Sequence, residues 1–448
     1  MKIYMPEDVK FIIDIFNKNN YEAYIVGGCV RDSILKRKPQ DWDICTNCNP
    51  EETMEIFKDY NVKTIPTGIE HGTITIVKNS KHYEVTTYRI EEEYRDHRRP
   101  SGVSFTNDLK KDLSRRDFTI NAMAYDDNDG IIDPFNGLED LENNIIRTVG
   151  IPQERFKEDA LRILRGIRFS GQLDFNIEKN TKEAMLIKGS LLEKISKERI
   201  RDEINKMLLS HRPSISFNTL KELDLFDYTI PELKATIDFE QKNPHHDKDV
   251  YSHIMLTLDN TERDLPLRLA ALLHDIGKPK CFTIGEDGIG HFYRHHMIGM
   301  DMSEEILKRL KYDNKTTKTV KVLIKEHMFK QDKLSDRAIK RFINRIGGEN
   351  LERFFKLQTA DIKASKPPYD FDNINYIKEK CKEILNRKEP LNVKELNING
   401  YDLMEIGIKQ GKEIGDILNY LLEKVLDNSD LNNKKDLMEL AKEKAGGQ

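Results

Sequence analysis

The chain has 448 residues, of which 33% are charged, and its formal net charge is −4 at pH 7. This length exceeds one ordinary core and predicts two to four domains. No apolar run is long enough to span a bilayer, and the first 20 residues predict an amphipathic helix in place of a signal peptide, so we expect a cytoplasmic protein without a membrane partner. The net charge excludes a protein that coats nucleic acid indiscriminately, so any such partner must be held by local basic surface.

The stretch 23–46 contains a pattern that suits a phosphate. An apolar strand leads into a Gly27-Gly28 turn and a short helix that contains Arg31. Glycines let the backbone approach a bulky anion, and the free N–H groups at a helix start favour phosphates. The pattern therefore predicts a phosphate-binding turn in an α/β head domain.

Two carboxylates, Asp41 and Asp43, follow this turn on a predicted second strand. Side chains two apart on a strand share one face, so the pair can bind one or two hard cations. A hairpin is predicted from strands near 73–77 and 83–88, and Glu84 on it is either a third carboxylate or an exposed strand residue. A phosphate turn beside paired carboxylates predicts nucleotidyl transfer.

Basic residues follow the hairpin. Residues 91–108 are charged and aperiodic, which predicts a surface loop whose arginines within 95–99 could reach over a nucleotide. Arg116 and Asp117 then precede an apolar segment. Arginine there suits a triphosphate by charge and forked geometry, while a structural salt bridge is the simpler alternative.

The pattern turns helical from residue 151, and Pro152 predicts the start of a helix that carries Asp159 and Arg162 on one flank. A carboxylate accepts from an exocyclic amine, and a guanidinium donates to the ring acceptor beside it. Cytosine and adenine present this combination, whereas guanine and uracil present a carbonyl in place of the amine. The pair could accept C and A without a template; a plain intrahelical ion pair is the alternative that spacing alone favours.

Five motifs occur in one order along the first half: residues 23–46, 84–89, 115–122, 158–162 and Glu198-Arg199. In this order they resemble the class II CCA-adding tRNA nucleotidyltransferases. The resemblance implies an α+β protein: a nucleotidyltransferase head with a mixed sheet, then mostly α-helical neck, HD and tail domains. It also implies a two-metal in-line attack by the tRNA 3′-hydroxyl on the α-phosphate, with pyrophosphate leaving.

The same resemblance implies roles for single residues. Asp41 and Asp43 match the catalytic carboxylates that hold Mg²⁺, and 95–108 matches the flexible loop used in switching from C to A. The implied nucleotide-binding residues are Gly27, Gly28, Arg31, Arg116, Asp117, Asn121, Asp159, Arg162, Arg165 and Arg168.

Three alternatives stay open. Bacterial poly(A) polymerases share the head, but the chain after Arg162 lacks the extended basic pattern associated with them. A specialist could add only CC or only A, although the basic loop speaks against a CC-only enzyme. A metal-dependent phosphohydrolase with an RNA-binding head is the third.

The second half contains His274-Asp275 within ALLHDIGKPK, which resembles the HD phosphohydrolase superfamily. Imidazole and carboxylate together suit Mn, Fe, Ni or Mg, and two such ions can activate water on a phosphoester. The ligands implied for this divalent site are His253, His274, Asp275, His296, His327 and Asp361. A scaffold without hydrolase activity stays an alternative.

The five cysteines are odd in number and scattered, which predicts reduced thiols. Near the C-terminus, Lys409 in a glycine-flanked turn resembles the family's tRNA-binding segment, with a simple turn as the alternative. We predict a head over 1–150, a neck over 151–232, an HD domain over 233–367 and a tail over 368–448. The expected enzyme builds or repairs the 3′ CCA end of tRNA from CTP and ATP, without an obligate protein partner.

Overall fold

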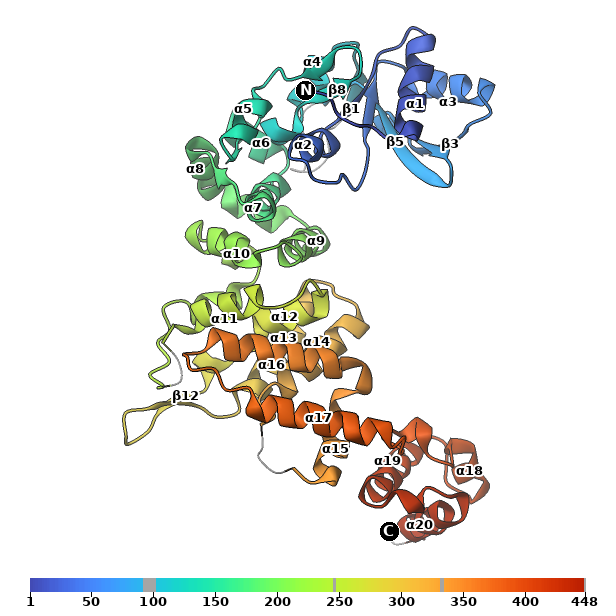
Figure 1. Ribbon diagram of the computed structural model, residues 1–448, viewed down its shortest axis with the longest axis vertical. Helices are drawn as coiled ribbons and strands as arrows, with labels where there is room; N and C mark the ends of the chain where they lie inside the picture. The colour runs from blue at the N-terminus through green and yellow to red at the C-terminus, as the bar shows by residue number, and fades with distance from the viewer. Residues whose placement is uncertain (92–101, 245–246, 331–333, 447–448) are drawn as a thin grey trace. The chain divides into compact units, whose positions relative to one another are not determined.

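The computed structural model describes residues 1–91, 102–244, 247–330 and 334–446. The chain divides into two compact units, Met1–Pro231 and Glu232–Gln448 (Figure 1). The division falls beside the predicted boundary between residues 232 and 233, while the finer four-domain scheme stays a prediction. No helix in the described ranges is long and apolar enough to cross a membrane.

A mixed seven-stranded sheet forms the head part of unit 1, with the order β3-β4-β5-β2-β1-β8-β9. Strands β2 and β5 are parallel and the other neighbours are antiparallel. This arrangement confirms the α+β class with a mixed sheet. The strands are β1 Ala23–Val26, β2 Ile44–Thr46, β3 Lys63–Gly68, β4 Thr73–Lys78, β5 Lys81–Thr87, β8 Ala124–Asp126 and β9 Gly130–Ile132.

The predicted hairpin is formed by β4 and β5, and Asn79 and Ser80 turn it with positive φ angles of 50° and 59°. Part of the segment predicted as a loop is a strand: β7 Val103–Phe105 pairs with β6 Arg89–Glu91. Its arginines at 95, 98 and 99 lie outside the described residues. The head helices are α1 Glu7–Lys18, α2 Gly28–Ile34, α3 Pro50–Asp59, α4 Leu109–Ser114 and α5 Gly137–Glu142.

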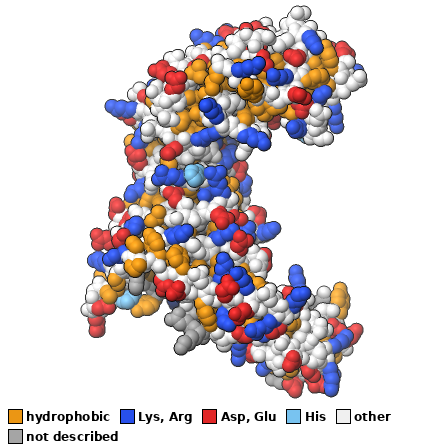
Figure 2. Space-filling view, viewed as in Figure 1, with side chains coloured by type: hydrophobic (Ala, Val, Ile, Leu, Met, Phe, Trp, Pro, Cys, Tyr) orange, Lys and Arg blue, Asp and Glu red, His pale blue; other side chains and the backbone are white. Residues whose placement is uncertain are grey.

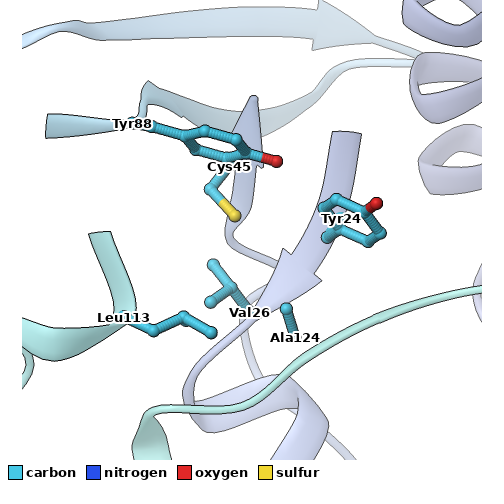
Figure 3. Packing of buried hydrophobic residues seen from close by; sticks show 6 residues of the cluster. All are labelled: Tyr24, Val26, Cys45, Tyr88, Leu113 and Ala124. Atoms are coloured by element: carbon cyan, nitrogen blue, oxygen red, sulfur yellow. The ribbon is translucent and has the colours of Figure 1, made fainter. Parts of the chain in front are cut away.

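A small apolar cluster anchors the central strands (Figure 3). Its members, all buried, are Tyr24, Val26, Cys45, Tyr88, Leu113 and Ala124. The sulfur of Cys45 points into the cluster, and burial raises the pKa of this thiol. The cluster therefore fixes β1 and β2. The end of β1 leads into the Gly27-Gly28 turn, and the start of β2 directly follows Asp43.

The neck part of unit 1 is helical, but the helix predicted to start at Pro152 and to carry Asp159 and Arg162 is broken at Asp159. Asp159 has extended backbone, with φ −135° and ψ 104°. Its carboxylate accepts the N–H of Leu161 and its carbonyl accepts the N–H of Arg162, each at 3.0 Å, so it starts a new helix. The elements are α6 Pro152–Glu158, α7 Leu161–Leu173, α8 Lys179–Lys188, α9 Lys197–Leu208, α10 Pro213–Glu222 and the parallel pair β10 Ile145–Ile146 and β11 Asn176–Ile177.

Unit 2 is mostly helical with one short hairpin. Helices α11, α12, α14 and α16 pack together, and α19 buries an apolar stripe that includes Ile417, Leu421, Leu422 and Val425. The elements are α11 Val250–Asp259, α12 Leu265–Leu273, β12 Phe282–Ile284, β13 Gly290–Phe292, α13 His295–Arg309, α14 Asn314–Glu326, α15 Asp336–Ile346, α16 Leu351–Ala364, α17 Asp372–Asn386, α18 Gly400–Glu405, α19 Lys412–Asp427 and α20 Lys434–Gly446.

Candidate functional sites

The turn between β1 and α2 requires glycine. Gly27 has a φ of +80°, and a Cβ at this position would lie 2.8 Å from Nη1 of Arg116. The Arg116 side chain therefore lies directly against the bare backbone of the turn. This contact places a cation beside the N–H groups at the start of α2, an arrangement that suits a phosphate.

The two predicted metal carboxylates precede β2, so their assignment to the strand is wrong. The strand begins at Ile44, and the last rung before it is the Val26 N–H donating to the Asp43 carbonyl at 3.0 Å. The reason is that β1 ends at Val26, where Gly27 turns the chain away and leaves Asp41 no partner strand. Of the two carboxylates, Asp43 lines a cavity of about 810 Å³ in unit 1 and Asp41 does not.

Carboxylates gather around Asp43. Loss of hydration raises its pKa, Arg116 lowers it, and the negative charges of Glu84 and Asp41 raise it further. Glu84, on β5, also lines the cavity, which favours the interpretation as a third carboxylate. Repelling carboxylates with oxygen donors fit a hard divalent cation such as Mg²⁺.

A cavity of about 810 Å³ brings the predicted nucleotide-binding residues of unit 1 together. The predicted residues that line it are Gly27, Gly28, Arg31, Arg116, Asp117, Asn121, Asp159, Arg162 and Arg165. Arg168 does not line it: this side chain donates to Glu203 at 2.6 Å and lies 4.0 Å from the ring centroid of Phe169. A cavity of this size suits a nucleotide.

Asp117 organises the polar wall of this cavity. It is 6% exposed and accepts hydrogen bonds from Nε of Arg165 at 2.7 Å and Nδ2 of Asn121 at 3.2 Å. Asn121 in turn accepts from Nη1 of Arg31 at 2.7 Å. Burial opposes ionisation of Asp117, but Arg165 and Arg162 outweigh it and lower the pKa to about 2. One fixed negative charge thus arranges the cationic side chains.

The two residues predicted to read the base have separate partners. Asp159 binds Nη2 of Arg199 at 2.8 Å, and Nη2 of Arg162 donates to the Arg115 carbonyl at 3.0 Å. The ion-pair partner of Arg162 is Glu158, so the structure gives no intrahelical pair between positions 159 and 162. The side chains of Asp159 and Arg162 both line the cavity.

Arg199 belongs to the fifth sequence motif, which gives it no role of its own. The structure places it on α9, in the cavity and against Asp159. Phe169 was also missed. It lines the cavity, and its ring faces the guanidinium carbons of Arg31 and Arg165 at 5.1 and 5.6 Å. The only sequence signal for Phe169 was its place one turn after Arg165.

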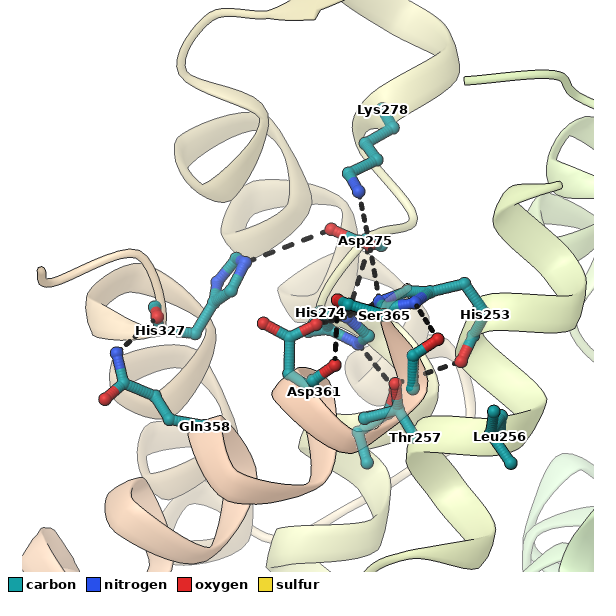
Figure 4. Close-up of polar contacts among 12 residues, drawn as sticks. His253, Leu256, Thr257, His274, Asp275, Lys278, His327, Gln358, Asp361 and Ser365 are labelled. Carbon is teal, nitrogen blue, oxygen red and sulfur yellow. Dashed lines mark hydrogen bonds and ion pairs between the residues drawn. The ribbon is translucent and has the colours of Figure 1, made fainter. Parts of the chain in front are cut away.

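A second cluster lies in unit 2 and contains two groups of three metal-ligating side chains (Figure 4). Within each group the ligand atoms lie within 4.8 Å of one another. The groups are His253, His274 and Asp361, and Asp275, His295 and His327. Asp275 lies between them, with Oδ2 3.2 Å from Nε2 of His274 and Oδ1 3.4 Å from Nε2 of His295.

The structure places His295 in this cluster where the sequence predicted His296. His295 is 4% exposed and its Nε2 lies 3.2 Å from that of His327, whereas His296 is partly exposed and outside both groups. The two residues open α13, where consecutive side chains point about 100° apart. Because both are histidines, only the rotation of the helix decides between them.

The cluster fits a divalent metal. Oδ2 of Asp275 is buried, with the Lys278 ammonium at 2.7 Å and Nε2 of His274 at 3.2 Å. Burial lowers the pKa of His327 to about 3 and also lowers that of His295, so both rings are in the neutral form that binds metals. In His274 burial is outweighed by Asp275 and Asp361, which raise the pKa. A buried carboxylate beside neutral imidazoles is a donor set for a transition metal.

The predicted tRNA-binding residue of the tail is exposed. Lys409 lies between α18 and α19 in a loop bounded by Gly407 and Gly411, whose φ angles are +93° and +145°. The following helix, α19, begins at Lys412, so Lys409 lies in the glycine-flanked turn. Its role in RNA binding stays a prediction.

Three family models match the chain: the poly A polymerase head domain over residues 23–147, the probable RNA and SrmB-binding site of polymerase A over 174–237, and tRNA nucleotidyltransferase domain 2 over 294–441. The CCA-adding enzymes of Streptococcus thermophilus and Staphylococcus haemolyticus are 35% and 36% identical to it, over 97% of each chain. The crystal structure of the Bacillus stearothermophilus CCA-adding enzyme in complex with CTP aligns with a TM-score of 0.71 at 27% identity, covering 99% of this chain and 100% of that one.

Proposed function

The chain belongs to the CCA-adding enzyme family, and on this basis we propose that it adds or repairs the 3′-terminal CCA of tRNA from CTP and ATP with release of pyrophosphate. One observation carries the proposal: a single cavity gathers the glycine turn, the carboxylate of Asp43 and the base-reading pair Asp159 and Arg162. A nucleoside triphosphate needs contacts of all three kinds.

In this proposal, different residues of the cavity contact different parts of the nucleotide. Arg116 and the N–H groups at the start of α2 receive the triphosphate, and the Asp117 network keeps Arg31 directed at it. Mg²⁺ held by Asp41 and Asp43 would neutralise the phosphates and lower the pKa of the attacking hydroxyl. The carboxylate of Asp159 accepts from the exocyclic amine of C or A.

Selection of the base requires that Asp159 keep one orientation. Its Oδ2 accepts from Nη2 of Arg199 at 2.8 Å, and its Oδ1 accepts from the Leu161 N–H at 3.0 Å and from Nη1 of Arg199 at 3.4 Å. Oδ2 therefore keeps a further lone pair to offer to the base. Arg162 is directed by Glu158. A base with a carbonyl in place of the amine would set two acceptors against each other, which disfavours U and G.

We propose a second site at the histidine cluster of unit 2, with HD-type metal-dependent phosphohydrolase chemistry. The two groups of three ligating side chains support it, as does a cavity of about 460 Å³ that Asp275, His327 and Asp361 line together with Lys278. The ligands are His253, His274, Asp275, His295, His327 and Asp361. A divalent metal here would supply an activated water for a phosphoester.

Two variants separate the activities. Asp43→Ala should abolish nucleotide incorporation into a tRNA transcript and leave hydrolysis of a phosphoester unchanged, and His274→Ala should do the reverse. Asp14→Ala, an exposed carboxylate on α1, is the matched control for the first. Incorporation that survives Asp43→Ala would show that the proposed active site is wrong.

A further inference from the structure

A groove lined by lysines lies between α13 and α14 of unit 2 and shares no lining residue with the histidine cavity. Its volume is about 310 Å³. Lys318, Lys321 and Lys325 lie at spacings of three and four on α14 and therefore share one face of that helix. Lys308 of α13 contributes a fourth ammonium group from the opposite wall.

The charges in this groove do not cancel. Glu304 is the one carboxylate that lines it, and it pairs with Lys308 at 2.8 Å and with Lys321. Hydrogen bonds from the same two lysines lower the pKa of Glu304 to about 2, so it is ionised. Lys318 and Lys325 are exposed and have no ion pair within the described part of the chain. The groove therefore carries an excess of positive charge.

Part of the groove lining is apolar. Met300 and Val322 line the groove and are half-buried, and the aliphatic stems of the lysines extend this apolar surface. A ligand that fits this groove has anionic groups that pair with the lysines and a less polar face that contacts the apolar lining. Figure 2 shows basic and acidic side chains interspersed over the face it draws, and the net charge of the chain is −4, so an excess of lysine in this groove is a local feature.

We infer that this groove holds the ribose-phosphate backbone of RNA, with phosphates at Lys318 and Lys325 and a ribose over Met300 and Val322. The inference rests on the proposed function, because that function requires an RNA substrate. Backbone contacts of this kind carry no sequence information and position the RNA. They would let a protein of negative net charge bind tRNA through a restricted surface.

The test is tRNA binding by the double variant Lys318→Gln/Lys325→Gln over a series of salt concentrations. The matched control is Lys18→Gln/Lys58→Gln, which removes two exposed lysines from α1 and α3 of unit 1. In the groove variant the negative slope of log K against log salt should become shallower by about 2. The KM for tRNA should rise about tenfold. Its KM for CTP and its kcat at saturating tRNA should match those of the control.

Three outcomes would overturn the inference. An unchanged salt slope and Kd in the groove variant, with normal CCA addition by the wild type, refutes the groove alone. Normal tRNA binding with loss of binding to poly-glutamate would identify the groove as a site for an acidic protein. A wild type and a control that both add no nucleotide would refute the proposed function instead, and with it the identity of the ligand.

Discussion

At the scale of single residues, Asp117 couples the stability of unit 1 to the order of its nucleotide cavity. Its carboxylate binds Arg165 and Asn121, and its pKa is about 2. Because this value lies below the ordinary value of about 3.9, the ionised form stabilises the fold above pH 4. That stability is lost as the pH falls through 4 towards 2.

Asp117→Asn should therefore lower the free energy of unfolding of unit 1 by about 2 kcal/mol at pH 7. The difference from the wild type should shrink as the pH falls below 4. The fluorescence of Trp42, the only tryptophan in the chain, reports on unit 1 in denaturant titrations. A difference that stays constant from pH 7 to pH 3 would contradict the assigned ion pair.

Asp159 decides base selection in this account. Asp159→Ala should lower the preference for CTP over UTP by about 10- to 100-fold, since a bidentate base contact is worth about 1–3 kcal/mol. Arg199→Gln should shift the preference in the same direction but less, because Arg199 acts by holding Asp159 at 2.8 Å. Competition assays with mixed nucleotides measure both. Arg199→Lys, which keeps the charge, should restore part of the preference; an unchanged preference in all three would exclude this pair.

At the scale of elements, the turn between β1 and α2 depends on Gly27. Gly27→Ala should cost about 1–3 kcal/mol of stability because φ is +80°, and should raise the KM for CTP because the new Cβ displaces Arg116. Gly28→Ala is the matched control for the backbone effect, since its nearest contact would be Arg31 at 3.7 Å. Trp42 fluorescence gives the stability. Equal losses in the two variants would refute the requirement for glycine at 27.

The start of α13 offers a second pair of matched variants. His295→Ala should weaken Mn²⁺ binding to unit 2 by more than about tenfold, because Nε2 of His295 belongs to a ligand group. His296→Ala should leave binding nearly unchanged. Metal content after dialysis, measured by mass spectrometry, separates them. Loss of metal only in His296→Ala would restore the sequence-based assignment.

Some elements could be predicted from the sequence and others could not. The hairpin β4–β5 and the helix at α1 follow from alternation and from helical spacing, so both were predicted. The break at Asp159 was not, because a residue that starts a new helix continues the same apolar spacing across the join. The choice between His295 and His296 depends on the rotation of one helix, which the order of residues does not encode locally.

At the scale of the whole molecule, the two compact units each contain a candidate site, the nucleotide cavity in Met1–Pro231 and the histidine cluster in Glu232–Gln448. The sequence predicted most residues of each site because their order along the chain matches known motifs, but it chose His296 instead of His295 and included Arg168, which does not line the cavity. It did not predict the partner of Asp159, since Arg199 lies 40 residues away on another helix. Contacts of that kind come from tertiary packing.

The central claim is that one active site adds C, C and A in order. The most direct measurement is nucleotide incorporation into a tRNA transcript that lacks its last three residues, with Mg²⁺ and with CTP and ATP supplied singly and together. We expect two additions with CTP alone and three with both nucleotides, sized on a gel. Arrest after two residues with both nucleotides would show a CC-only enzyme, and addition of A only to a transcript ending in CC would show an A-only enzyme. No addition to any transcript would contradict the account.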